Sequence, residues 1–175
     1  MKTSVALIGF MGTGKTVVGK ALAHRLGKEF VELDALIEKK AGRSIPEIFR
    51  DSGETAFRAL EIEVTGEVAG RKNAVIACGG GLVLNRINID RLRTECIIIY
   101  LTASAEVILK RTSREASSRP LLSVPDRLGQ IKDLLRFRRP FYERAADMTV
   151  NTSRRSIDSV VARIIGELQE NENYR

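Results

Sequence analysis

Short runs of consecutive apolar residues alternate along the chain with longer segments in which apolar residues recur at helical spacing. Continuous apolar strands that alternate with helices are typical of a parallel sheet covered by helices on both faces. The pattern therefore predicts an α/β protein. The predicted strands are residues 5–8, 30–33, 74–78, 96–101 and 148–151.

The segments between these strands carry helix signals. Ser44-Ile45-Pro46-Glu47 has the form of a capping box with proline in the first turn. Pro140 predicts that the helix beginning at Asp126 ends at Arg138, because proline disfavours helical backbone in the residue before it. The predicted helices are residues 16–26, 34–41, 45–49, 54–69, 104–111, 126–138 and 156–169.

Residues 112–125 form a polar connection with four serines and two prolines. A loop of this length inside a compact domain is usually functional or disordered. We interpret it as a mobile lid, with an unstructured connection as the alternative. The chain shows no repeat, low-complexity tract or linker, so residues 1–175 are expected to form a single domain.

The composition, 43% hydrophobic and 29% charged, excludes a disordered tail, a collagen-like repeat and a disulfide scaffold. Cys78 and Cys96 match no zinc-ligand spacing and are expected to be reduced thiols. The chain has neither a signal-peptide cleavage site nor an apolar stretch long enough to span a membrane. We therefore expect a cytoplasmic protein that does not bind membranes.

The net charge of +7 is local, because residues 111–155 contain ten arginines and one lysine against five acidic residues. Such a segment could bind nucleic acid, bind a small anion or form a solvated face. Aromatic residues that would stack on bases are sparse there, which disfavours nucleic acid. The excess of arginine over lysine favours capture of phosphate or carboxylate.

Residues 9–16, Gly-Phe-Met-Gly-Thr-Gly-Lys-Thr, match the P-loop pattern and lie between a predicted strand and a predicted helix. Glycines at Gly12 and Gly14 let backbone N–H groups around Thr13 converge on phosphate at the positive end of the helix. Lys15 would reach the β- and γ-phosphates, and the Thr16 hydroxyl would bind Mg²⁺. The sequence therefore predicts a nucleoside triphosphate site.

Further candidates follow the second and third strands, at the carboxyl edge where open α/β sheets bind ligands. Gly79, Gly80 and Gly81 would let a ligand approach the backbone, although a bare tight turn is the alternative. Asp34 would project from the same edge, or serve as an ordinary carboxylate at a helix start.

Other charged residues give weaker signals. Arg58 and Glu61 stand at i, i+3, a spacing that usually marks a surface pair. Arg119 and Arg138 would each more commonly be solvated than functional. His24 is expected to be a surface residue without a role.

Taken together, these motifs resemble the shikimate kinase family over nearly the whole chain. The resemblance rests on the P-loop, Asp34 with Ile37-Glu38, Gly53-Glu54-x-x-Phe57-Arg58-x-x-Glu61 and the triple glycine. It continues through Ile45-x-Glu47-Ile48-Phe49, Arg119-Pro120-Leu121-Leu122 and Arg138-x-Pro140-x-Tyr142. The P-loop is shared by many families, whereas the ordered set is specific to this one.

The resemblance implies transfer of the γ-phosphate of ATP to the 3-hydroxyl of shikimate, in chorismate and aromatic amino-acid biosynthesis. It implies the fold of nucleoside monophosphate kinases, a three-layer α/β/α P-loop protein with a five-stranded parallel sheet. A mobile lid over residues 112–125 and a substrate-binding region over about residues 32–61 belong to that fold. The implied partners are ATP and shikimate, with Mg²⁺ as cofactor, and the protein is expected to be a monomer.

Site roles follow from the same resemblance. Asp34 would accept hydrogen bonds from substrate hydroxyls and act as base, while Arg119 would close over the γ-phosphate. Arg58 and Arg138 would clamp the substrate carboxylate. Gly80 and Gly81 would offer backbone N–H groups, and Phe49 and Phe57 would form a wall against the substrate ring. Gly79 completes the implied acceptor site.

One position departs from the family pattern, and the adenine contacts match it loosely. Glu32 stands where the family usually has an aspartate near the Mg²⁺ water shell, so we expect it to hold the ion through a water. Arg111 aligns with an arginine that stacks on adenine in relatives, and Arg155 is expected to contact ATP. The loop around Arg155 lacks the family's usual proline.

Two other functions remain open at this stage. One is a kinase of the same fold that acts on another small polyol acid, such as gluconate. The other is a nucleotide-binding domain without catalytic activity. The presence of Lys15, Thr16, Asp34 and Arg119 together disfavours a degenerate enzyme.

Overall fold

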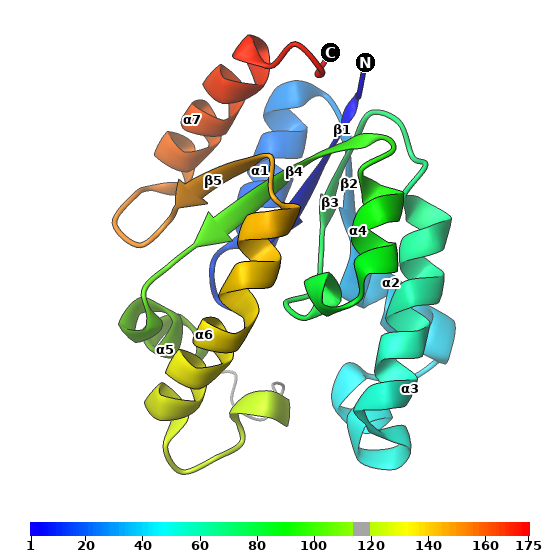
Figure 1. Ribbon diagram of the computed structural model, residues 1–175, viewed down its shortest axis with the longest axis vertical. Coiled ribbons are helices and arrows are strands. Elements are labelled where there is room, and N and C mark those ends of the chain that lie inside the picture. Colours follow the sequence, from blue (N-terminus) through cyan, green and yellow to red (C-terminus); the bar gives the residue numbers. More distant parts are fainter. Residues whose placement is uncertain (114–119) are drawn as a thin grey trace.

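A single parallel sheet forms the centre of the computed structural model, which describes residues 1–113 and 120–175. Its strand order is β2-β3-β1-β4-β5, with every neighbouring pair parallel (Figure 1). This arrangement confirms the predicted α/β class and the five-stranded sheet. The strands are β1 Ser4–Ile8, β2 Glu29–Glu32, β3 Ala74–Ala77, β4 Cys96–Thr102 and β5 Met148–Asn151.

Helices cover both faces of the sheet, as the continuous apolar strands predict. On one face, α1 and α7 bury side chains such as Leu22 and Ile164 against β1 and β4. On the other face, α2, α3, α4 and α6 bury side chains such as Ile37, Leu92 and Tyr142. The helices are α1 Lys15–Leu26, α2 Leu33–Ala41, α3 Ile45–Val68, α4 Arg86–Leu92, α5 Ala105–Thr112, α6 Arg127–Ala145 and α7 Ile157–Glu170.

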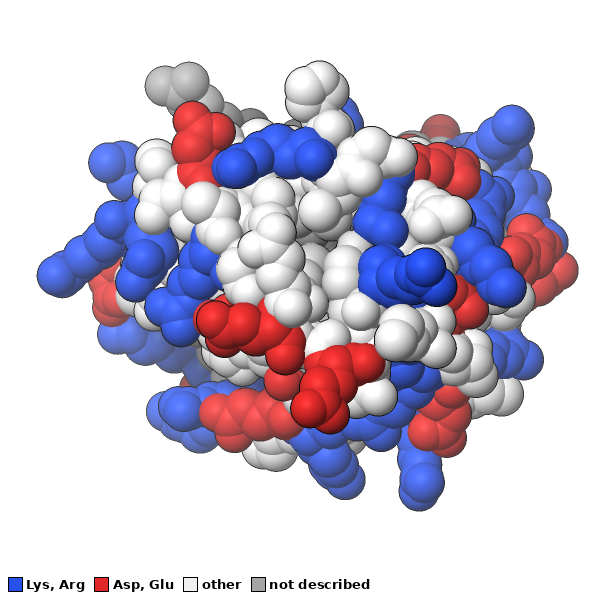
Figure 2. Space-filling model, turned by 90° about the horizontal axis from the view of Figure 1, so that it is seen from above, with Lys and Arg blue, Asp and Glu red and all other residues white. Residues whose placement is uncertain are grey.

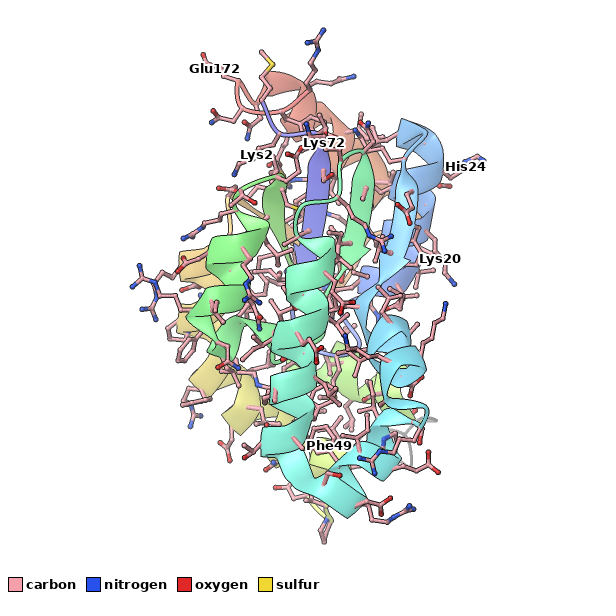
Figure 3. The ribbon with its side chains drawn as sticks, turned by 90° about the vertical axis from the view of Figure 1, so that its right-hand side faces the viewer. Lys2, Lys20, His24, Phe49, Lys72 and Glu172 are labelled. Carbon is pink, nitrogen blue, oxygen red and sulfur yellow. The ribbon has the colours of Figure 1, made fainter. Side chains whose placement is uncertain are left out.

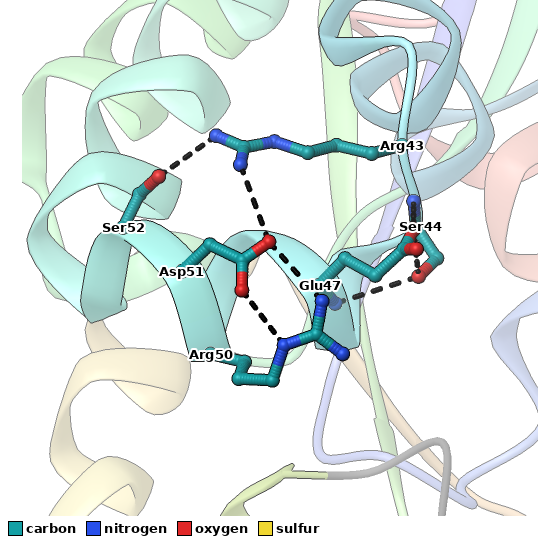
Figure 4. A network of polar contacts seen from close by, with 6 residues as sticks. All are labelled: Arg43, Ser44, Glu47, Arg50, Asp51 and Ser52. Atoms are coloured by element: carbon teal, nitrogen blue, oxygen red, sulfur yellow. Dashed lines mark hydrogen bonds and ion pairs between the residues drawn. The ribbon is translucent and has the colours of Figure 1, made fainter.

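The start of α3 confirms the predicted capping box. The Ser44 hydroxyl accepts a hydrogen bond from the Glu47 N–H, and the Glu47 carboxylate accepts one from the Ser44 N–H at 2.7 Å (Figure 4). Arg43 reaches across to the Ser52 hydroxyl at 2.7 Å. The two helices predicted over residues 45–69 form one element with a kink at Gly53, where φ is 81°.

The structure corrects the predicted end of α6. The helix continues through Pro140 to Ala145, although proline removes one backbone hydrogen bond. Its last turn is held by tertiary contacts instead, because the buried Tyr142 ring stacks on Tyr100 with 4.8 Å between centroids. Tertiary packing therefore overrides the local stop signal.

One helix is absent from the prediction. The seven-residue α4 is too short for apolar spacing to reveal a helix, yet it buries Ile89 and Leu92 in the core. A 3₁₀ turn, η1 Leu82–Leu84, precedes it and follows the triple glycine directly. Another such turn, η3 Pro120–Leu122, lies between α5 and α6.

The two chain ends lie together at the amino-terminal edge of the sheet (Figure 1). Lys2 and Tyr174 form a parallel β-bridge there. Phe49 lies at the opposite end of the molecule, while His24 projects outward from α1, as predicted for a surface residue (Figure 3). In the described residues, none of the helices has the length and apolar character that a membrane span requires.

Candidate active site

The predicted P-loop connects β1 to α1 at the carboxyl edge of the sheet. Gly9 has φ of 148°, and a Cβ atom there would lie 2.4 Å from the Leu101 carbonyl oxygen. A side chain at this position would therefore force β4 away from the loop. The loop can pass this close to the sheet only with glycine at its first position.

Lys15 folds back over the loop. Its ammonium group donates to the carbonyl oxygens of Gly9 and Phe10, both at 2.9 Å. Lys15 lines a cavity of about 490 Å³, which we call the nucleotide cavity. The cavity is lined by Met11, Gly12, Gly14, Lys15, Thr16, Val17, Glu32, Asp34, Cys78, Gly79, Gly80, Arg111 and Thr112.

A polar network joins this cavity to the end of β5. The Thr152 hydroxyl lies 2.8 Å from the Thr13 carbonyl oxygen and 3.1 Å from that of Thr102. Arg111 donates to the Gly12 carbonyl at 3.1 Å and to the Thr152 carbonyl at 2.8 Å. Sequence reasoning missed Thr152, because its partner Thr13 is 139 residues away.

Arg155 has a different position from that of Arg111. It is exposed in the turn after β5 and does not line the nucleotide cavity. Thr13 is also outside the cavity lining, because its side chain is buried beneath the loop and bonds the Phe10 carbonyl at 2.8 Å.

A second cavity, of about 270 Å³, adjoins the first, and we call it the acceptor cavity. The two cavities share Met11, Asp34, Gly79 and Gly80 in their linings. The acceptor cavity is lined by Met11, Asp34, Glu38, Ile45, Pro46, Phe49, Phe57, Arg58, Glu61, Gly79, Gly80, Gly81, Leu121 and Arg138. All substrate-binding residues predicted from the sequence therefore face one space.

Arg58 and Glu61 are not the surface pair that their spacing suggests. Glu61 is fully buried, and its Oε1 accepts a hydrogen bond from Arg58 Nη1 at 2.9 Å. Glu61 belongs to the buried side of α3, with Phe57 and Val64, which spacing alone does not reveal. The outer side of the Arg58 guanidinium donates to exposed Glu54 at 3.1 Å.

Glu61 is a strongly perturbed carboxyl group of this site. Burial raises its pKa to about 6, against the opposing effect of the Arg58 guanidinium; Asp34 raises it further and Arg138 lowers it. Its second oxygen, Oε2, has no hydrogen-bond partner among the described residues. Arg138 is itself only 2% exposed, with its guanidinium 5.6 Å from the centre of the Phe10 ring.

The triple glycine packs directly against these charged groups. A Cβ atom on Gly79 would lie 2.8 Å from Glu61 Oε2 and 3.1 Å from Asp34 Oδ1. One on Gly81 would displace the Arg58 guanidinium, 2.2 Å away. The Tyr142 hydroxyl donates to the Gly80 carbonyl oxygen and anchors the turn to α6.

Two aromatic rings form an apolar wall of the acceptor cavity. The rings of Phe49 and Phe57 lie 4.9 Å apart between centroids. The Arg58 guanidinium carbon lies 5.1 Å from the centre of the Phe57 ring. The cavity thus combines guanidinium groups, carboxylates and a flat apolar surface, which suits a small cyclic anion bearing hydroxyl groups.

Glu32 ends β2 and lines the nucleotide cavity together with Thr16. Burial raises the pKa of Glu32, while a hydrogen bond with the Thr16 hydroxyl lowers it. In the described part of the chain, His, Cys, Asp and Glu form no group of three or more that could hold a metal ion.

The predicted lid, residues 112–125, is described only in part, because residues 114–119, Arg119 among them, lie outside the described residues. Leu121 lines the acceptor cavity, and Leu122 is buried in a cluster with Phe10 and Ile131.

On the face shown in Figure 2, basic and acidic side chains of the described residues are interspersed around an uncharged centre.

Comparison with known proteins gives a consistent result. The family model described as shikimate kinase matches residues 11–169. The shikimate kinase of Symbiobacterium thermophilum is 46% identical over 168 residues, which cover 95% of this chain and 97% of that protein. The shikimate kinase of Caldanaerobacter subterraneus subsp. tengcongensis is 47% identical, covering 93% of this chain and 94% of its own.

A solved structure agrees with this sequence similarity. The structure of shikimate kinase from Acinetobacter baumannii in complex with shikimate superposes with a TM-score of 0.94 at 37% identity. The superposition covers 98% of this chain and 96% of the other. The sheet order, the P-loop and the full-length similarity lead to one conclusion: the chain belongs to the shikimate kinase family.

Proposed function

We propose that this protein transfers the γ-phosphate of ATP to the 3-hydroxyl of shikimate, giving shikimate 3-phosphate and ADP. The observation that carries the proposal is the junction of the two cavities at Met11, Asp34, Gly79 and Gly80. A phosphate held by the P-loop and an acceptor held by the arginines would meet there. The relative from A. baumannii was solved with shikimate bound, which supports the choice of acceptor.

The substrate carboxylate is bound by Arg58 and Arg138. Both guanidinium groups face the acceptor cavity, and both are largely removed from water. Charge-assisted hydrogen bonds are stronger at such low exposure, because less solvent competes for the donors. Glu61 and Glu54 each accept one hydrogen bond from Arg58, which leaves the other N–H groups of the guanidinium for the ligand. Phe49 and Phe57 pack against the ring of the substrate.

Asp34 orients the hydroxyl groups of the acceptor and receives the proton. Its carboxylate faces both cavities, so it lies where the 3-hydroxyl would approach the γ-phosphorus. The hydroxyl oxygen forms the new P–O bond as the bond to the β–γ bridging oxygen breaks. The proton of the hydroxyl passes to Asp34, and ADP carries away the electron pair of the broken bond.

Lys15 and the glycine-rich backbone stabilise the charge that develops on the phosphates. The Lys15 ammonium now bonds two carbonyl oxygens of the loop, and phosphate oxygens would accept from the same N–H groups. Phosphoryl transfer depends mainly on such positioning and charge neutralisation. Gly12, Thr13 and Gly14 would contribute backbone N–H groups to the same phosphates.

Thr16 and Glu32 are the residues that would hold Mg²⁺, Thr16 through its hydroxyl and Glu32 through a water. Their contact across the nucleotide cavity fits an ion held mostly by water and phosphate. When bound, Mg²⁺ neutralises charge on the β- and γ-phosphates.

Several finer assignments remain part of the proposal. Arg111 would contact the adenine side of ATP, and Arg155 would do so only after moving toward the cavity. Arg119 would reach the γ-phosphate from the lid and exclude water. We further propose a cytoplasmic monomer, formed as a single domain.

The proposal is tested by measuring ADP release with ATP and Mg²⁺ and three alternative acceptors: shikimate, quinate and gluconate. We expect turnover with shikimate to exceed turnover with the other two by orders of magnitude. Faster turnover with gluconate would assign a different polyol acid. Nucleotide binding without turnover on any acceptor would indicate a binding domain, and either result would overturn the proposal.

A further inference from the structure

Asn88 is a fully buried polar residue of α4 that the proposed reaction does not use. Its Nδ2 donates to the Leu82 carbonyl oxygen at 3.1 Å. Because that carbonyl can only accept, the amide group must present its nitrogen to Leu82. The orientation of the Asn88 side chain is therefore fixed by chemistry.

This orientation has an energetic cost. Asn88 Oδ1 is buried and has no hydrogen-bond partner among the described residues. A buried acceptor without a partner destabilises the folded state, whereas an apolar side chain of similar shape avoids that loss. The neighbouring Ile89 and Leu92 show that α4 otherwise buries apolar side chains. Stability alone thus gives little reason for an asparagine at this position.

The partner of Asn88 connects it to the triple glycine. Leu82 is the first residue of η1 and follows Gly81 directly. The Leu82 N–H bonds the Gly79 carbonyl at 3.3 Å, and the Leu84 N–H bonds the Gly81 carbonyl at 3.1 Å. Such single-turn hydrogen bonds are weaker than those of an α-helix. The hydrogen bond from Asn88 adds a side-chain anchor to this short turn.

The glycine turn is thereby held from two sides. Tyr142, on α6, donates to the Gly80 carbonyl oxygen, and Asn88, on α4, holds Leu82. We infer that Asn88 is a positioning residue for the acceptor site. It fixes η1 so that Gly80 and Gly81 keep the backbone geometry that the substrate requires. This inference rests on the proposed function, in which the backbone N–H groups of Gly80 and Gly81 would bind shikimate.

The decisive variant is Asn88→Leu, which removes both polar atoms and keeps a similar volume. We expect the KM for shikimate to rise about 5-fold, the effect of losing one neutral hydrogen bond. The KM for ATP should stay within about 2-fold. The melting temperature should not fall, because the unpaired acceptor is removed as well.

Asn85→Leu is the matched control. Asn85 is three residues away at the start of the same helix, is half-buried, and makes no capping hydrogen bond with its side chain. Its replacement should leave both KM values unchanged. If Asn88→Leu cannot be folded, Asn88→Ala makes the same comparison.

Hydrogen exchange provides a second measurement that does not depend on the substrate assignment. The Asn85 N–H bonds the same Leu82 carbonyl as Asn88 does, at 3.3 Å. In the free protein, the Leu82, Leu84 and Asn85 amides should exchange faster in Asn88→Leu than in the wild type. Faster exchange in a protein that does not use shikimate would refute the proposed function but not the anchoring of η1. Faster exchange with an unchanged shikimate KM would overturn the positioning role. Unchanged exchange, or an equal rise in both KM values, would show that Asn88 only packs.

Discussion

The nucleotide cavity and the acceptor cavity are built in opposite ways. The P-loop, residues 9–16 from the end of β1 into the first turn of α1, supplies most of the phosphate-binding groups of the first. The second draws its side chains from α2, α3, the turn after β3 and α6. A site formed by one continuous loop is visible in the sequence, whereas a site assembled by tertiary packing is not.

The two cavities also differ in how their charges are stabilised. Lys15 is half-buried and bonds carbonyl oxygens of its own loop. Arg138 and Glu61 are almost completely buried and belong to a charged group that includes Arg58. Removing one member of a buried charged group leaves the others uncompensated. Substitutions in the acceptor cavity should therefore affect stability as well as binding, and those in the P-loop mainly catalysis.

The largest expected effect is that of Lys15→Ala. The loss of a charge that stabilises the transferring phosphate should lower kcat by about 100- to 1000-fold. The unfolding midpoint should change little. Lys39→Ala, an exposed lysine on α2 outside both cavities, is the control and should be fully active. A Lys15→Ala enzyme with normal kcat would remove the P-loop from the mechanism.

Arg58→Ala and Arg138→Ala should affect the acceptor cavity rather than the nucleotide cavity. Each should weaken shikimate binding by about 10- to 150-fold, because a charge-assisted hydrogen bond is lost. The affinity for ATP should change much less, and calorimetric titration with each ligand separates the two. Arg139→Ala is the matched control, since Arg139 is exposed, pairs with Glu143 and lies outside the acceptor cavity. A selective loss of ATP affinity would disprove the carboxylate clamp.

The sequence predicted the two cavities with unequal success. The P-loop could be identified from residues 9–16 alone, because spacing and glycine content determine its backbone. The environment of Glu61 could not be predicted, because its spacing from Arg58 does not show which side of α3 packs into the core. Pro140 was wrongly predicted to stop its helix, since the packing of Tyr142 onto Tyr100 is not visible locally. Sequence patterns thus predict local geometry well and long-range contacts poorly.

Glu32 lines the nucleotide cavity, and its substitution tests how the metal is held. Glu32→Ala should weaken Mg²⁺-dependent ADP binding and activity by about 10- to 100-fold, as losses outside the direct ligands typically do. Glu32→Asp should remain within a few-fold, because a water-mediated contact can absorb one methylene group. Glu29→Ala is the control, since Glu29 starts the same strand, is exposed and pairs with Arg71. An unaltered Mg²⁺ titration of Glu32→Ala would place this carboxylate outside the metal site.

The smallest expected effect is a pH dependence of the free energy of unfolding, which arises from buried Glu61 and not from exposed carboxylates. Burial raises the pKa of Glu61 from its ordinary value of 4.5 to about 6. The folded protein therefore binds the proton of this carboxyl group more tightly than the unfolded chain does. The stability that Glu61 contributes is therefore fully present below pH 4.5 and is lost as the pH rises through 6. The loss amounts to about 2 kcal/mol.

Glu61→Gln cannot ionise but still accepts a hydrogen bond from Arg58. The free energy of unfolding of the wild type relative to this variant should fall by about 2 kcal/mol between pH 4 and 7. Chemical denaturation across this pH range measures the difference. Glu54→Gln replaces the exposed carboxylate that bonds the outer side of Arg58, and its difference from the wild type should be nearly constant. If the two variants gave the same pH dependence, burial would not be what separates the acceptor cavity from the rest of the molecule.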